Sequence, residues 1–185
     1  MNIFVLDNDP VIAAQQQCDK HVVKMIVESG QMLSTAHRML DGIIERRPSK
    51  SGKTTVNYYK LEDDRENILY KAVHHNHPCS VWTRECCVNY TWHYHHFLAL
   101  CEEYKHRYGK VHSTDTKLRH ILRNKPHNIP HEHEMTPFKL AMKSNPECIA
   151  LGDPIEAYRA FYQTKQERFK MEWTNRTRPS WFHAV

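Results

Sequence analysis

A histidine and a glutamate lie seven residues apart in a segment with helical periodicity, which places both on one face of a helix. These are His21 and Glu28, with Lys24 between them. Positions i and i+7 are two helical turns apart on the same side, and position i+3 lies near the same line. Such a trio could present an acid, a base and a cation to one substrate group. A solvated helix face gives the same pattern, so spacing alone leaves both interpretations open.

Histidine is unusually frequent, with 15 among 185 residues, and much of it is clustered at residues 74–77, 93–96 and 131–133. His93 and His96 can share a helix face, and segment 74–79 could add a third ligand to a zinc or iron site. The chain lacks HExxH and paired CxxC spacings, and packing with hydrogen bonding is the alternative. We therefore predict no metal site and no cofactor.

Basic and aromatic residues are interleaved in two stretches, residues 104–125 and the tail 176–185. Cations can contact phosphates while aromatic faces stack on bases, which is typical of DNA-processing proteins. A solvated basic surface, with a tail that merely packs on the core, is the alternative. The candidate DNA-binding residues in these stretches are Arg107, Lys110, Arg119, Arg123, Arg178, Trp181 and Phe182.

The composition predicts one globular domain spanning residues 1–185, with 40% hydrophobic and 25% charged residues. Five glycines disfavour a turn-rich β-sandwich and a glycine-rich phosphate-binding fold, and the net charge of +5 is compatible with nucleic acid. Six cysteines without a CxxC pair indicate reduced thiols. No apolar run approaches the roughly eighteen residues of a membrane helix, and no signal peptide is evident. We expect a cytoplasmic protein without membrane contact.

Three long helices are expected to position these residues, in an all-α fold with long irregular connections. Helical periodicity and Asp-Pro starts predict helices over 10–41 and 154–173, and a third helix over 80–108 ends at a glycine. The basic segment 45–57 is predicted to be a mobile loop, because it has little to bury. Residues 3–6 could form a short strand.

Three motifs together resemble the pyrimidine-dimer DNA glycosylases of the phage endonuclease V type. Asp19-Lys20-His21, followed by Glu28, is similar to that family's Asp-Gln-His motif with a glutamate seven residues after the histidine. The segment from His77 to Gly109 resembles its second long helix, which ends in a basic turn. The tail 178–182, Arg-Pro-Ser-Trp-Phe, resembles its Arg-Pro-Thr-Trp-Tyr. The resemblance covers roughly half of the chain, and its phage-type origin is compatible with a virus-encoded protein that acts in the host cell.

The resemblance implies a glycosylase and abasic-site lyase whose nucleophile is the N-terminal amine, here that of Met1. An α-amino group is partly neutral at physiological pH and can attack the sugar C1′ to form a Schiff base. Glu28 would stabilise the developing sugar cation and assist proton transfer, and His21 would orient or hydrogen-bond near the amine. The partner would be damaged or modified double-stranded DNA with a nucleotide flipped out of the stack.

The chain departs from this family where the family places arginines around its glutamate and N-terminus. Val27, Gln31 and Asn2 stand at those positions. As further candidate DNA-binding residues, Lys20, Lys24 and Arg38 could replace that clamp only in part, because lysine is a point charge without a planar fork. Two alternatives therefore stay open: an enzyme of the same scaffold that modifies a base or nucleotide without excising it, and a non-catalytic nucleic-acid-binding protein. The histidine clusters are where we expect a difference in substrate or activity to reside.

Overall fold

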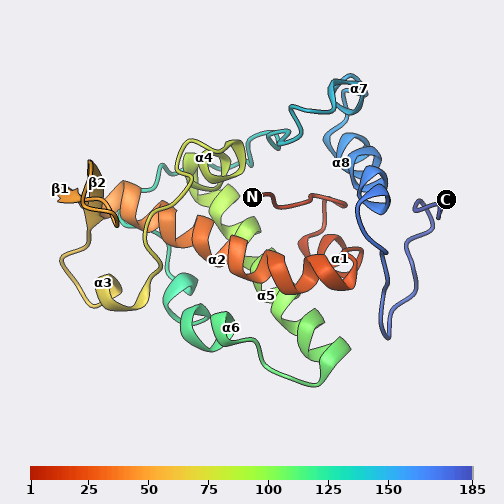
Figure 1. Cartoon of the computed structure of the whole chain (residues 1–185), viewed down its shortest axis with the longest axis horizontal. Helices are drawn as coiled ribbons and strands as arrows, with labels where there is room; N and C mark the ends of the chain where they lie inside the picture. Colours follow the sequence, from red (N-terminus) through yellow and green to blue (C-terminus); the bar gives the residue numbers. More distant parts are fainter. Residues whose placement is uncertain (185) are drawn as a thin grey trace.

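The computed structural model describes residues 1–184 and is about 49% helical (Figure 1). Two of its helices are long, and they cross to form the centre of the molecule. The α-helices are α1 (Pro10–Gln15), α2 (Asp19–Asp41), α3 (Arg65–Ile68), α4 (Pro78–Glu85), α5 (Cys87–Tyr108), α6 (Ser113–Leu118), α7 (Pro146–Ile149) and α8 (Pro154–Gln163), with 3₁₀ turns η1 (Ile121–Arg123) and η2 (Thr164–Glu167).

The core forms where α2 packs on α5, with α1 and α4 against the same two helices. Val22, Ile26 and Leu33 of α2 are fully buried, as are Phe97 and Leu100 of α5. Each such side chain contributes about 1.5–3 kcal/mol when it is removed from water. This packing holds α2 rigidly, and α2 carries His21, Lys24 and Glu28.

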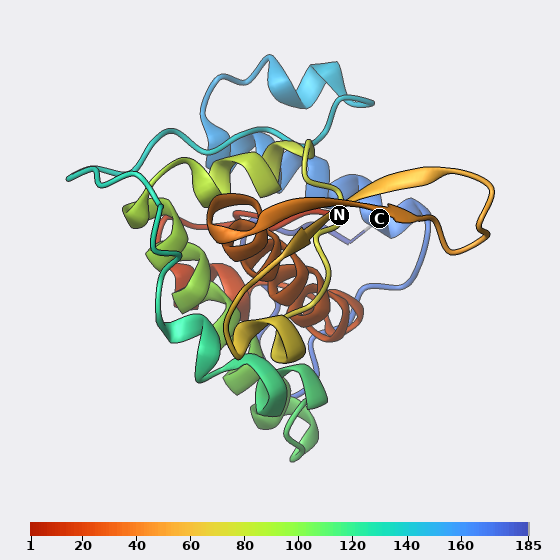
Figure 2. The same ribbon diagram turned by 90° about the vertical axis from the view of Figure 1, so that its left-hand side faces the viewer.

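The prediction of an all-α fold is wrong, because the basic segment forms an antiparallel hairpin. Strands β1 (Ile43–Pro48) and β2 (Thr55–Lys60) pair from Ile43 opposite Lys60 to Pro48 opposite Thr55. The hairpin projects from the body of the protein, as Figure 2 shows. The Arg47 guanidinium lies 3.5 Å from the centre of the Tyr58 ring across the two strands. Such stacking across the strands stabilises the hairpin, which the sequence pattern did not predict.

The three predicted long helices are also shorter or interrupted. The segment 10–41 breaks at Cys18, whose backbone N–H donates to the Tyr162 hydroxyl at 2.9 Å. The segment 80–108 begins earlier, at Pro78, and breaks at Cys86, where the N–H of Cys87 donates to the carbonyl of Pro130. The last helix ends at Gln163, well before residue 173. The breaks at Cys18 and Cys86 each coincide with a hydrogen bond to a distant segment. Hydrophobic periodicity carries no information about such contacts.

Residues 1–6 form an unpaired segment that runs through the core rather than the short strand considered for residues 3–6. Ile3 and Leu6 are buried, and the Gln17 side chain donates to the Ile3 carbonyl at 3.0 Å. The Asn2 side-chain oxygen accepts the backbone N–H groups of Ile3 and Phe4 at 2.8 and 2.9 Å. Phe4 adopts a left-handed conformation with φ of 56°. These contacts fix the direction of the first residues and hence the position of Met1.

In the part of the chain that the structure describes, no helix is both long and apolar enough to cross a membrane.

Candidate active site

The amine of Met1 and the carboxylate of Glu28 face one another at the start of the chain. The Met1 nitrogen lies 3.8 Å from Glu28 Oε2, which also accepts the backbone N–H of Asn2 at 2.8 Å. The other carboxylate oxygen lies 3.3 Å from the Lys24 ammonium, one helical turn earlier on α2. The Glu28 side chain is only 11% exposed, so these charges meet in a partly desolvated setting where electrostatic effects are strong.

The main chain of Met1, rather than its side chain, is the accessible part of the residue. The side chain is 3% exposed, although the residue as a whole is only partly buried. Its sulfur lies 3.7 Å from Ser80 Oγ near the start of α4. A thioether held in this way anchors the residue while its main-chain end faces a pocket.

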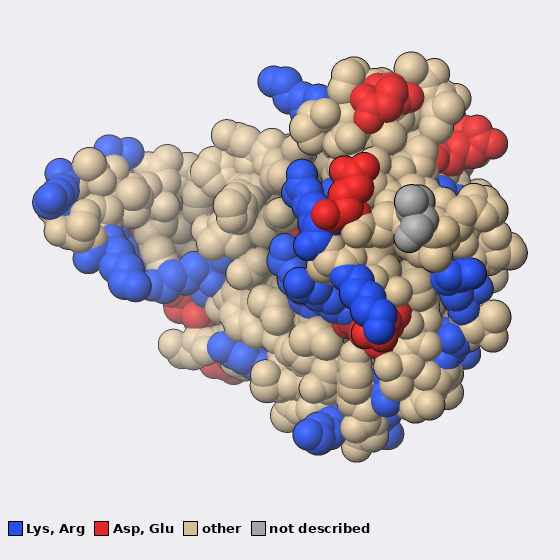
Figure 3. All heavy atoms as spheres, turned by 45° about the vertical axis from the view of Figure 1, so that its right-hand side comes forward, with Lys and Arg blue, Asp and Glu red and all other residues tan. Residues whose placement is uncertain are grey.

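This pocket has a volume of about 300 Å³ and lies between the N-terminal segment, α2 and the α8–η2 region. Its polar lining includes three cations, Lys24, Lys165 and Arg168. Figure 3 shows Lys and Arg side chains clustered near the middle of one face of the molecule, and others along the hairpin. The apolar lining includes Phe4, Phe161 and Phe169. A small cavity with a carboxylate, an amine, cations and aromatic walls can take a ring-bearing anion such as a nucleotide.

His21 lines the same pocket but is held as a neutral ring. It stacks on Phe4 with ring centres 4.5 Å apart, and its Nδ1 lies 2.8 Å from the Tyr162 hydroxyl. Burial, together with the nearby lysine charges, that of Lys24 first among them, lowers the pKa of His21 to about 3. His21 is therefore uncharged at neutral pH, and it positions Phe4 and the N-terminal segment rather than donating a proton.

Comparisons with protein-family models, with curated proteins and with solved structures give no match. The glycosylase resemblance therefore stays a prediction, and the argument for function rests on the site itself.

One histidine of the 74–77 cluster lies close enough to the site for the charges of Met1 and Glu28 to affect its pKa. His77 caps α4, with its Nδ1 accepting the N–H of Cys79 at 3.2 Å. Burial lowers the pKa of His77, and the positive charge of the Met1 amine lowers it further, against an opposing effect of Glu28. His77 belongs to the histidine cluster that the sequence singled out, although it does not line the pocket. Lys165 and Arg168 were not predicted as site residues, because their place depends on segments that meet only in the folded chain.

The histidines of the 93–96 cluster that face inward are structural. His93 Nδ1 lies 2.7 Å from Thr83 Oγ1, and its Nε2 lies 3.1 Å from Ser29 Oγ. His96 Nδ1 lies 2.9 Å from the Pro10 carbonyl. Within residues 1–184, no group of three His, Cys, Asp or Glu side chains is arranged to hold a metal ion. His93 and His96 therefore lie outside the pocket beside Met1, and the expectation that this cluster marks a difference in substrate or activity stays a prediction.

Two arginines predicted to bind DNA lie inside the protein. The Arg38 residue is 1% exposed, and its guanidinium donates to Glu66 and to the carbonyls of Tyr59, Glu66, Leu69 and Tyr70. The Arg107 side chain is fully buried between Glu103 and Asp19, at 2.7 and 2.8 Å. Neither guanidinium is available to a phosphate. Sequence position gave no hint of these acceptors, which lie on other segments for Arg38 and partly on α2 for Arg107.

Of the remaining predicted residues, some are exposed and the others pair with acidic side chains or pack on the core. Arg119 is partly buried and pairs with Asp115 and Glu102, both at 2.7 Å. In the tail, Trp181 donates to Gln16 Oε1 at 3.0 Å and Phe182 is buried, so these aromatics pack on the core. The exposed members are Lys20, Lys24, Lys110, Arg123 and Arg178.

Proposed function

We propose that the protein is a DNA-processing enzyme that uses the Met1 amine as a nucleophile and Glu28 as its acid–base partner. The observation that carries the proposal is the separation of 3.8 Å between the Met1 nitrogen and Glu28 Oε2 in a pocket lined with cations. A nucleophile needs a neighbouring group that can take its proton, within hydrogen-bond reach or slightly beyond it before substrate binds. Glu28 meets that requirement.

The reaction class is glycosylase and abasic-site lyase chemistry. The amine lone pair forms a bond to C1′ of a flipped nucleotide, while the bond from C1′ to the base breaks and the base leaves with the electron pair. Glu28 accepts the proton that the amine loses, and can return it to the ring oxygen when the sugar opens to the Schiff base. In the lyase step the Schiff base loses a proton from C2′, and the electron pair of that bond expels the 3′ phosphate. Water then releases the amine from the sugar. Lys24 lies 3.3 Å from the other carboxylate oxygen and forms an ion pair with it.

The cations around the pocket provide the attraction for the DNA backbone. Lys24 is largely exposed, and Lys165 and Arg168 line the pocket from the opposite wall. Asn2 cannot serve as a clamp, because its side chain is used internally: it donates to the Ala141 carbonyl at 3.0 Å and accepts two backbone N–H groups. Phosphate contacts therefore come from the exposed Lys24 and Arg168 rather than from the N-terminus, because Lys165 is buried over the Phe161 ring.

The test is reductive trapping on DNA. The full chain, tagged at its C-terminus, is incubated with duplexes that contain an abasic site or a pyrimidine dimer in the presence of borohydride, and the adduct is mapped by mass spectrometry. We expect a covalent adduct at the Met1 amine, and its loss when that amine is acetylated. The same spectra establish whether the chain carries a free Met1 amine, which the mechanism requires.

Lys24→Ala and Lys165→Ala serve as controls, because each lysine is an alternative amine in the same pocket. Both variants should still form the adduct on Met1. An adduct that maps to either lysine would overturn the role of Met1. DNA that is altered without loss of a base or strand would point to the base-modifying alternative, and binding without any chemistry would point to a nucleic-acid-binding protein.

A further inference from the structure

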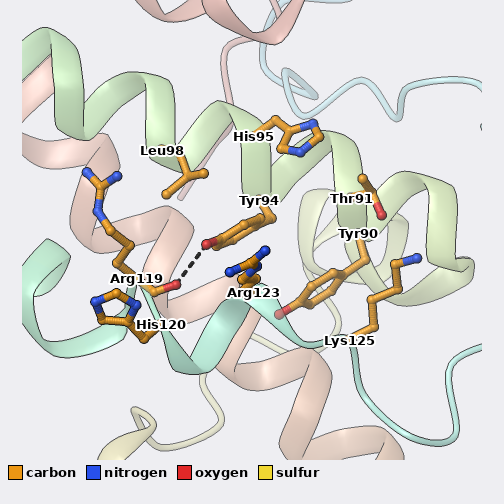
Figure 4. Close-up of a pocket in the computed structure, with 9 residues that line it drawn as sticks. All are labelled: Tyr90, Thr91, Tyr94, His95, Leu98, Arg119, His120, Arg123 and Lys125. Atoms are coloured by element: carbon orange, nitrogen blue, oxygen red, sulfur yellow. Dashed lines mark hydrogen bonds between the residues drawn. The ribbon is translucent and has the colours of Figure 1, made fainter.

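A second pocket, with a volume of about 510 Å³, lies between α5 and the segment around η1. Figure 4 shows side chains from the two segments turned toward a common space. None of its lining residues lines the pocket beside Met1 and Glu28. It is a separate site, and the proposed function makes no use of it.

The floor of this pocket is a stripe of one helix face. Tyr90, Tyr94 and Leu98 follow one another at intervals of four on α5, so their side chains lie in a row. The Tyr94 hydroxyl donates to the Arg119 carbonyl at 2.8 Å, and the Tyr90 hydroxyl donates to the Leu122 carbonyl at 2.9 Å. Both phenol groups are thereby fixed, and the pocket keeps a preformed apolar floor.

The rim of the pocket carries positive charge that the protein leaves uncompensated. Arg123 and Lys125 are exposed, and neither side chain makes a hydrogen bond or ion pair with any residue from 1 to 184. The Arg119 guanidinium, in contrast, is engaged by Asp115 and Glu102. His95 and His120 complete the polar lining, and no carboxylate belongs to it. A guanidinium and an ammonium without partners, above an apolar floor, match a ligand with an anionic end and a flat ring.

We propose that this pocket binds a nucleotide, with its phosphate on Arg123 and Lys125 and its base against Tyr94 and Leu98. The volume lies in the range of small-molecule sites, which are concave, largely apolar and furnished with few charged groups. The nucleotide can be free in solution or part of a single strand, since both offer the same phosphate and ring.

The experiment is an NMR titration of the full chain that follows the methyl groups of Leu98 and Thr91, which both line the pocket. The probes are dAMP, inorganic phosphate and a five-nucleotide single strand. We expect dAMP or the strand to shift both methyl groups and to saturate, and phosphate alone to bind at least tenfold more weakly. Tighter binding of the strand identifies a strand site, and equal or tighter binding of dAMP identifies a free-nucleotide site.

The double variant Arg123→Ala with Lys125→Ala should lower the affinity at least tenfold. The matched control, Lys71→Ala with Lys143→Ala, removes the same charge from exposed positions outside both pockets and the hairpin and should bind as the native chain does. Both pairs are exposed, so the fold is checked by the amide spectrum. Absence of methyl shifts with all three probes, equal affinity for phosphate and dAMP, or equal loss in the two double variants would overturn the proposal. The Glu28→Gln variant should bind normally, so failure here is independent of the proposed chemistry.

Discussion

Glu28 Oε2 contacts both the amine of Met1, at 3.8 Å, and the backbone N–H of Asn2, at 2.8 Å. One carboxylate oxygen therefore both anchors the start of the chain and faces its terminal nitrogen. The anchor fixes where the amine lies, because the next residue cannot move away without losing a charge-assisted hydrogen bond. The proposed catalytic role of Glu28 and its role as an anchor rest on one side chain, and substitution of Glu28 can separate them.

We expect Glu28→Gln to lower the rate of adduct formation by about 10²–10⁴-fold, the usual contribution of a positioned acid or base. The amide oxygen of glutamine can still accept the Asn2 N–H, so the fold should be kept. Single-turnover trapping measures the rate, and thermal unfolding checks the fold. DNA affinity should stay near that of the native chain. A variant that is folded, binds DNA and reacts at the native rate would contradict the role of Glu28.

Stability should fall as the pH is lowered from 7 toward 5, because several histidines are buried as neutral rings. Burial lowers the pKa of His21 to about 3 and the pKa values of His37 and His96 to about 4. Below the ordinary histidine pKa of about 6.5 the unfolded chain binds protons that the folded chain does not. The stabilisation is therefore complete above about pH 6.5 and is lost progressively toward pH 4, at up to about 1.4 kcal/mol per pH unit for each histidine.

Urea unfolding at pH 7, 6 and 5 measures this slope. His96→Gln should reduce it by the part that one histidine contributes, and His131→Gln, on an exposed segment, should leave it unchanged. A free energy of unfolding that is level between pH 7 and pH 5 would contradict the neutral burial of these rings.

Arg38→Met should destabilise the fold by about 3–5 kcal/mol, the cost of breaking a buried charged network by removing one partner. It removes the donor for four backbone carbonyls and leaves the Glu66 carboxylate without its guanidinium. Any loss of DNA binding should follow the loss of folded protein. Arg46→Ala, on the exposed hairpin, is expected to change stability by no more than about 0.5 kcal/mol. Equal stability of the two variants would show that Arg38 is not a structural residue.

The hairpin should contribute to DNA binding through its charge. Lys50 and Lys53 lie exposed in the turn between β1 and β2. If both lysines contact phosphates, Lys50→Ala with Lys53→Ala should weaken DNA binding at low salt. The slope of the logarithm of the affinity against the logarithm of the salt concentration, called the salt slope, should fall in magnitude by about 2. Fluorescence anisotropy over a range of salt concentrations measures both. The charge-preserving pair Lys50→Arg with Lys53→Arg should keep the native slope, and an unchanged slope in the alanine pair would exclude the hairpin from the interface.

Features that depend on neighbours a few residues away along the chain could be predicted from the sequence. Asp9 and Asp153 cap α1 and α8 ahead of prolines, as predicted, because a cap bonds to N–H groups only two or three residues away. Gly109 ends α5 in a left-handed conformation for the same local reason. The common face of His21, Lys24 and Glu28 follows from helix geometry alone, and all three line one pocket.

Features that depend on partners far away in the chain could be recognised only in the folded structure. Cys18 interrupts the first helix because Tyr162, 144 residues later, takes its N–H. Arg38 is structural because its acceptors lie on the segment around Glu66, and Lys165 joins the site because η2 folds back beside α2. Residue type and spacing specify hydrogen bonds within a few residues. The packing of the whole core sets which distant acceptor, ring or charge a side chain meets. The burial of each residue and the set of residues in the site therefore could not be predicted from residue type and spacing.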